Sequence, residues 1–237
     1  MKPYYQDEYA TIYHGDALDL MMDGTIGEID GVVMDPPYCS GGRNVGTARK
    51  IFEKSMREDW FLTDNMGTDT YIWWIRHIGA NLFRLATVGS HFYCFTDWRQ
   101  YNNVVLALES VGWTLRSCIV WNKMKGGAMG SFWRNDHEWI AVFSKGPNRP
   151  LPNGGFFNVL SDTKPQGDLH PTVKPLSVIQ RLVEATDNGL LLDPFMGSGT
   201  TLLAAKNLGR MAIGIEVEEK YCEEAALRLS QEVLPLT

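Results

Sequence analysis

The stretch GVVMDPPYCS, residues 31–40, places an acid, two prolines and a tyrosine directly after an apolar run. The run is typical of a buried parallel strand, and Pro36 and Pro37 end it because they fix φ and lack backbone donors. Asp35 is therefore expected at the carboxyl end of the strand, where open α/β sheets bind their ligands. Together with Tyr38, the stretch offers a ligand a carboxylate, carbonyl acceptors on a stiff backbone and an aromatic ring.

A second stretch, LLLDPFMGSGTTLLAAKNLG at 190–209, has the composition of a nucleotide-binding loop. Its apolar run ends in Asp193, a turn follows with Gly197 and Gly199, and a helix is expected from about Thr200. Glycines let a ligand approach the backbone closely, and the N-terminus of a helix favours electron-rich groups. The stretch therefore indicates nucleotide binding.

The acid that ends the next apolar run supports this interpretation. Glu216 lies where an acid commonly accepts hydrogen bonds from the ribose hydroxyls of a nucleotide. The alternative is the dinucleotide-binding loop of a nucleotide-dependent oxidoreductase. Against that alternative, Gly197-Ser198-Gly199 lacks the third glycine of GxGxxG and follows Asp-Pro-Phe.

Short apolar runs alternate with helical patterns along the chain and predict the elements that position these residues. Strands are expected at 10–16, 30–35, 90–95, 115–121, 138–143, 190–193 and 211–216, and helices at 69–87, 98–110, 175–187, 200–208 and 217–232. This alternation predicts an α/β fold, with a mostly parallel sheet covered by helices on both faces. Long loops are expected at 39–67, 122–135 and 146–171, and such loops are commonly functional.

Length and composition favour a single domain spanning 1–237. The 237 residues include 44% hydrophobic and 21% charged side chains, which is ordinary globular composition and excludes a disordered chain. No apolar stretch reaches the roughly 18 residues of a membrane helix, and the N-terminus lacks the apolar core of a signal peptide. Four well-separated cysteines without a CxxC pair favour reduced thiols in the cytoplasm over disulfides or a zinc site. We therefore expect no membrane segment and no metal.

Taken together, these segments resemble the DNA amino-methyltransferases, which transfer a methyl group from S-adenosylmethionine to an exocyclic nitrogen of adenine or cytosine. DPPY at 35–38 resembles the family's catalytic tetrapeptide, and DPFMGSG at 193–199 resembles its cofactor loop. HPTVKP at 170–175 is similar to the segment just upstream of that loop, and HGDALDLM at 14–21 to the strand end that holds the cofactor's adenine. The tetrapeptide precedes the glycine loop, which is the order of the family's beta group.

The resemblance implies a Rossmann-like methyltransferase fold with a circularly permuted, seven-stranded sheet. One strand would be antiparallel and come from the segment 115–143. The strand ending in Asp193 would lie centrally. On one side it would have the strands ending near Asp16 and Glu216, and on the other the strand ending at Asp35.

The resemblance also implies catalytic roles for Asp35, Pro36, Pro37 and Tyr38. An exocyclic amino group is a poor nucleophile because its lone pair is delocalised into the ring. The Asp35 carboxylate and the Pro36 carbonyl could each accept one N–H, which would free the lone pair for attack on the sulfonium methyl. Tyr38 offers a ring on which a base flipped out of the duplex can stack. The plainer alternatives are a turn acid for Asp35 and a packed aromatic for Tyr38.

Carried over position by position, the resemblance assigns cofactor binding to residues from both ends of the chain. They are Asp16, Ala17, Asp35, Thr172, Lys174, Asp193, Phe195, Gly197, Ser198, Gly199, Thr200 and Glu216. Asp16 would accept from the adenine amino group, and Lys174, assisted by Thr172, would pair with the methionine carboxylate. Phe195 would pack against the cofactor. A surface turn, a solvated lysine and a core aromatic are the respective alternatives.

Two basic clusters could contact double-stranded DNA, although the net charge of −6 argues against binding by bulk attraction. One lies between residues 43 and 57 and the other between 116 and 149, each with a net charge of +4. The contacts are expected within the inserted loops 39–67 and 122–170. The residues expected to bind phosphates are Arg43, Arg49, Lys50, Lys54, Arg57, Lys123, Lys125 and Arg134. The competing interpretation of the first cluster is a solvated face or a homodimer contact.

The first residue of the tetrapeptide bears on the target base. Asp at this position is commoner in the family's adenine-N6 enzymes, whereas cytosine-N4 enzymes more often carry Ser. We therefore expect a site-specific DNA methyltransferase acting on adenine N6. Cytosine N4 is the alternative, and a catalytically silent DNA-binding relative is less favoured. The short segment 146–170 leaves little room for target recognition, which fits a solitary or phage-borne methylase of a bacterial cytoplasm.

Overall fold

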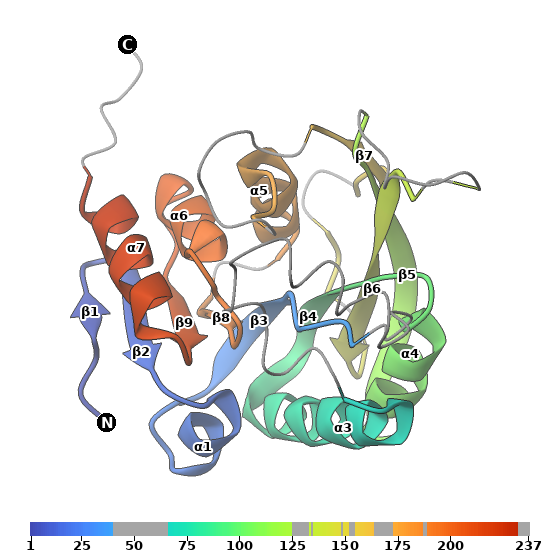
Figure 1. The fold of residues 1–237 in the computed structure, drawn as a ribbon, viewed down its shortest axis with the longest axis horizontal. Coiled ribbons are helices and arrows are strands. Elements are labelled where there is room, and N and C mark those ends of the chain that lie inside the picture. Colours follow the sequence, from blue (N-terminus) through green and yellow to red (C-terminus); the bar gives the residue numbers. More distant parts are fainter. Residues whose placement is uncertain are drawn as a thin grey trace, which may run out of the picture.

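A computed structural model describes residues 1–39, 66–124, 133, 135–147, 149–151, 155–163, 173–186 and 189–231. A single sheet runs through this part of the chain, with helices on both faces (Figure 1). The strands are β1 (Tyr5–Gln6), β2 (Ala10–His14), β3 (Ile29–Met34), β4 (Ala86–Thr96), β5 (Trp113–Asn122), β6 (His137–Lys145), β7 (Val159–Ser161), β8 (Leu191–Asp193) and β9 (Ala212–Glu216). The helices are α1 (Ala17–Met22), α3 (Thr68–Leu85), α4 (Tyr101–Glu109), α5 (Leu176–Glu184), α6 (Thr200–Asn207) and α7 (Glu219–Ser230).

The described strands follow the order β1-β2-β9-β8-β3-β4-β6-β5-β7. The strands β2, β9, β8, β3 and β4 run parallel to one another, whereas β6 is antiparallel to both β4 and β5. This confirms the permuted α/β fold and the antiparallel strand expected from the segment 115–143. It also confirms the place of β8, which ends in Asp193 and lies between β9 and β3.

Two short strands extend the expected seven-stranded sheet at its edges. β1 pairs antiparallel with β2, and β7 pairs parallel with the last residues of β5. β7 falls inside the segment 146–171, so the expectation of a continuous loop there is wrong. A strand of three residues carries too little periodic pattern to be recognised from its own sequence.

The sheet separates two hydrophobic cores. Helices α1, α3 and α4 cover one face, and α5, α6 and α7 cover the other (Figure 1). In β3, Val32 and Met34 belong to the first core and Val33 belongs to the second. Burial on both faces explains why this strand is a continuous apolar run. None of the described helices has the length and apolar character needed to cross a membrane.

Gly214 of β9 lies where the glycine loop and α6 pack closely on the sheet. A Cβ at this position would lie 2.4 Å from Met196 Sδ and 2.8 Å from Leu202 Cδ1. Gly214→Ala should therefore lower the free energy of unfolding, measured by urea denaturation, by about 1–3 kcal/mol, the usual cost of overpacking. Gly27→Ala is the control, because a Cβ there meets nothing within 4 Å. Equal stabilities of the two variants would contradict this packing.

Candidate active site

Parallel strands bring the predicted acids to one edge of the sheet. Asp35 directly follows β3, Asp16 lies two residues after the end of β2, and Asp193 and Glu216 end β8 and β9. These four strands are neighbours, in the order β2-β9-β8-β3. The edge therefore carries the glycine loop and its acids next to the tetrapeptide 35–38, as expected of a ligand site in an open α/β sheet.

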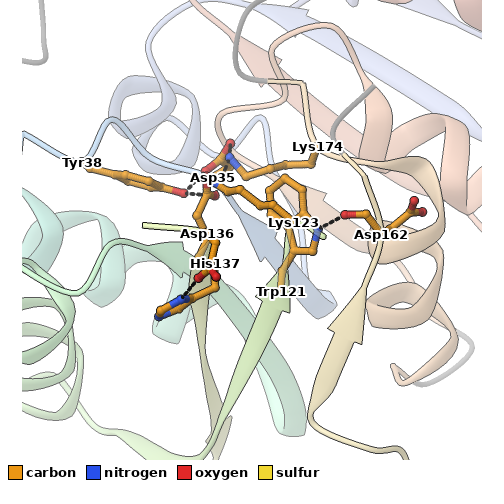
Figure 2. A network of polar contacts seen from close by, with 9 residues as sticks. Asp35, Tyr38, Trp121, Lys123, Asp136, His137, Asp162 and Lys174 are labelled. Carbon is orange, nitrogen blue, oxygen red and sulfur yellow. Dashed lines mark hydrogen bonds and ion pairs between the residues drawn. The ribbon is translucent and has the colours of Figure 1, made fainter. Parts of the chain in front are cut away.

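The Asp35 carboxylate is engaged by two side chains (Figure 2). Lys174 Nζ donates to Oδ2 at 2.6 Å, and the Tyr38 hydroxyl donates to Oδ1 at 3.0 Å. Lys174, which precedes α5, is 8% exposed, so its ammonium group needs a paired anion. Burial raises the pKa of Asp35, and Lys174 opposes that rise. The Asp35 side chain is 26% exposed, which leaves part of it accessible to a ligand.

A second carboxylate, Glu138 of β6, contacts the same groups. It accepts from the Tyr38 hydroxyl at 3.0 Å and from Lys123 Nζ at 2.7 Å, and Lys174 Nζ lies 3.3 Å away. Burial alone would raise the pKa of Glu138, but Lys174 and Lys123 lower it to about 2. Asp35, Glu138, Lys123 and Lys174 thus form a four-charge cluster with no net charge beside Tyr38.

Sequence reasoning missed Glu138. Glu138 was counted only as an acid that reduces the net charge of the basic cluster between residues 116 and 149. Its partner Tyr38 is 100 residues away in sequence. No local spacing links two residues so far apart. The available signal was an acid at the start of the apolar strand expected at 138–143, where a buried carboxylate needs partners.

Lys123 is the described member of the residues expected to bind DNA. Its ammonium group pairs with Glu138, and it lies over the Trp121 ring at 5.4 Å. The Trp121 indole in turn donates to the Asp162 carbonyl at 3.0 Å, which ties the end of β5 to the end of β7 (Figure 2). The other residues expected to bind DNA lie outside the described residues: Arg43, Arg49, Lys50, Lys54, Arg57, Lys125 and Arg134. The cofactor residue Thr172 also lies outside them.

Backbone hydrogen bonds join Glu216 to the glycine loop. Glu216 Oε2 accepts from Gly197 N at 3.0 Å, and Oε1 accepts from Glu218 N at 2.8 Å. Gly197 and Gly199 have φ values of 50° and 78°, which favour glycine. A Cβ at Gly199 would lie 2.8 Å from Ala225 Cβ, whereas at Gly197 it would meet nothing within 4 Å. The open side of Gly197, next to the Glu216 carboxylate, suits a cofactor that approaches the backbone closely.

The other residues assigned to the cofactor have partners within the fold. Asp16 caps α1, Phe195 packs on Trp74, Ser198 and Thr200 bond to Arg228 of α7, and Ala17 is buried. α1 itself is absent from the predicted elements, because its six residues cover less than two turns and give little periodicity. These contacts hold the strand ends and the loop in place, and the cofactor roles of these residues stay predictions.

Comparison with known proteins identifies the family. The family model N6_N4_Mtase, described as DNA methylase, matches residues 29–154 and 152–227. The matched segments include both the tetrapeptide and the glycine loop. The chain therefore belongs to this family of DNA methylases.

Individual relatives match over nearly the whole chain. Type II methyltransferase M2.LlaDCHI of Lactococcus lactis subsp. cremoris is 27% identical, over 97% of this chain and 93% of that protein. Type II methyltransferase M2.MboI of Moraxella bovis is 28% identical, over 100% of this chain and 93% of that protein.

Solved structures also match. The M1.HpyAVI–SAM complex has a TM-score of 0.70 at 25% identity and covers 93% of this chain and 100% of its own. PvuII DNA methyltransferase (cytosine-N4-specific) has a TM-score of 0.77 at 16% identity, covers 98% of this chain and 90% of its own, and shares the fold.

Because of Asp193, the free energy of unfolding should depend measurably on pH. Asp193 is 4% exposed, and burial raises its pKa to about 7 from an ordinary value of 3.8. A carboxyl whose pKa rises on folding stabilises the fold when protonated, and this contribution is lost as the pH rises through the folded value. The free energy of unfolding should therefore decrease as the pH rises from 3.8 to about 7. This group contributes a decrease of at most ~1.4 kcal/mol per pH unit.

Asp193→Asn should flatten that part of the stability curve, since the amide keeps an acceptor for Phe195 N but does not ionise. Denaturation at a series of pH values measures it. Asp69→Asn, at the exposed start of α3, is the control and should follow the parent. If the Asp193→Asn curve runs parallel to that of the parent, the carboxyl is not protonated in the fold.

Proposed function

We propose that this DNA methyltransferase acts on the exocyclic N6 of an adenine flipped out of double-stranded DNA. Its cofactor is S-adenosylmethionine, which supplies an electrophilic methyl group on a sulfonium sulfur. The observation that carries the proposal is the Asp35 carboxylate. It is partly exposed, is held by Lys174 and Tyr38, and lies at the strand edge that also carries the glycine loop.

The tetrapeptide acts on the amino nitrogen. Asp35 accepts one N–H and the Pro36 carbonyl accepts the other, which returns electron density from the ring to the nitrogen lone pair. The amino group becomes acidic only as the new N–C bond forms, so no strong base is needed. Asp35 can take the released proton, because burial raises its pKa.

The backbone around the tetrapeptide supports preorganised acceptors. Cys39, directly after it, has a φ of 46°, and its carbonyl accepts from Gln100 Nε2 at 3.0 Å. Gln100 immediately precedes α4, so the segment is fixed at both of its ends, by β3 and by this contact. Fixed acceptors need little reorganisation during the reaction. We assign Tyr38, which is half-buried beside Asp35, to stacking against the flipped base.

The cofactor is assigned to the other half of the edge. We place it against the open side of Gly197, with Glu216 accepting from ribose hydroxyls and Asp16 accepting from the adenine amino group. The carboxylate of Glu216 is buried and fixed by two backbone donors, which supports a role in orientation. The methionine end would extend toward Asp193, next to the β3 end that carries Asp35.

The basic residues of 39–67 and 122–170 are proposed to bind the DNA backbone. The segment 39–67 follows Tyr38 directly, so it starts at the place where the target base enters. Phosphate contacts there would supply affinity and register but little sequence information. The preference for adenine over cytosine rests on Asp35 as the first residue of the tetrapeptide.

Asp35→Ala tests the assignment. The parent, incubated with duplex DNA and S-adenosylmethionine, should yield N6-methyladenine when the DNA is digested and its nucleosides are identified by mass spectrometry. The variant should lose about 100-fold or more of the rate, because it lacks an acceptor that acts in the transition state. Its affinity for duplex DNA should stay close to the parent value.

Asp69→Ala, on the exposed face of α3, is the matched control and should methylate at the parent rate. N4-methylcytosine as the product would replace adenine by cytosine as the target. Substantial methylation by Asp35→Ala would remove Asp35 from the mechanism.

A further inference from the structure

We propose that Glu138 is a positioning residue that keeps Lys174 paired while Asp35 engages the amino group of the target base. The proposal rests on the proposed function, in which Asp35 is the acceptor for that amino group. Glu138 acts through Lys174 and Tyr38.

Lys174 creates the need for a second anion. Its side chain is 8% exposed, and its ammonium group lies 2.6 Å from Asp35 Oδ2. A carboxylate held at this distance by an ammonium group has much of its charge already satisfied, which weakens it as an acceptor for a neutral N–H. A buried ammonium group left without a partner is in turn costly. Asp35 is therefore available to the base only if another anion, in the protein or in the cofactor, pairs with Lys174.

Glu138 lies close enough to pair with Lys174. Its Oε2 lies 3.3 Å from Lys174 Nζ and accepts from the Tyr38 hydroxyl at 3.0 Å. Its Oε1 accepts from Lys123 at 2.7 Å, which fixes the carboxylate and keeps it ionised. The Tyr38 hydroxyl has one proton and lies 3.0 Å from each of the two carboxylates, so it can donate fully to only one at a time. Glu138 thus contacts Lys174, Tyr38 and Lys123.

The direction of β6 explains why an acid from this strand reaches the site. β6 is antiparallel to β4 and β5, so its first residues lie at the carboxyl ends of those strands. In the register, Glu138 is opposite Trp121, next to the end of β5. An acid at the same position of a parallel strand would lie at the far edge of the sheet.

Glu138 also adjusts the charge that surrounds Asp35. Four titratable groups face Asp35 from outside its own segment: Glu138 of β6, Cys94 of β4, Asp193 of β8, and Lys174, which precedes α5. Tyr38 faces it from within the segment. Among them Lys174 lowers the pKa of Asp35 and Glu138 raises it. Without the Glu138 charge, Lys174 would pair with Asp35 alone, and Asp35 would hold a proton less strongly. Both changes weaken Asp35 as an acceptor.

Glu138→Gln removes the charge and keeps the shape. The single-turnover methylation rate, at saturating DNA and S-adenosylmethionine, should fall at least about tenfold. The affinity for S-adenosylmethionine, measured by calorimetry, should change less than about threefold, since the cofactor loop is untouched. The acidic limb of the rate–pH profile should move to lower pH, because Asp35 loses a neighbouring negative charge. Glu138→Asp, which keeps the charge, should recover part of the rate and return the limb toward that of the parent.

Glu184→Gln is the matched control. It makes the same change in an exposed ion pair with Arg181 on α5 and should match the parent in rate and profile. A Glu138→Gln protein with the parental rate would overturn the proposal. So would a slow variant whose acidic limb stays in place, because that result indicates structural support alone.

Two further results keep the test decisive. If Glu138→Gln does not fold, Glu138→Asp carries the test, since its shorter side chain lengthens the contact with Lys174 and should slow the reaction. A parental rate in that variant would then overturn the proposal. If Asp35→Ala still methylates DNA, the proposed function fails instead, and this result is independent of either Glu138 variant.

Discussion

The buried pair of Lys174 and Asp35, 2.6 Å apart, is the interaction on which the site depends. The Lys174 side chain is 8% exposed, so its ammonium group has to be neutralised by a nearby anion, and the nearest carboxylate is the one proposed to bind the substrate. This conflict explains the second pair of charges, Glu138 and Lys123, whose carboxylate and ammonium lie 2.7 Å apart. With all four groups present the cluster is neutral, so one carboxylate can change partners without leaving a buried charge uncompensated.

The fold supplies these groups from distant parts of the chain. Asp35 follows β3, Lys174 precedes α5, Glu138 is the second residue of β6, and Lys123 follows β5. Three properties of the sheet bring them together: the parallel strands end at one edge, the inverted β6 starts at that edge, and β8 lies next to β3. The glycine loop then follows β8 on the same edge. The strand order therefore sets the distance between the cofactor loop and the catalytic carboxylate.

The parts of this site that the sequence predicts are those with a local signal. Asp35 and Asp193 each end an apolar run and start a turn of distinctive composition, and Glu216 ends the next strand. The neighbours of β8 follow from the family resemblance, since periodicity carries no information on strand order. Glu138 and the protein partners of Lys174 depend on contacts across 100 and 139 residues of sequence. α1 and β7 are missed because six and three residues are too few to show a period.

A structure of the protein with S-adenosylhomocysteine and a DNA duplex containing its target site would test the role of Asp35 most directly. We expect the amino nitrogen of a flipped adenine within about 3.2 Å of an Asp35 carboxylate oxygen. Lys174 Nζ should then be closer to Glu138 than the 3.3 Å of the present structure. A flipped base whose amino nitrogen lies beyond hydrogen-bond reach of Asp35, with the Lys174–Asp35 pair intact, would contradict the account.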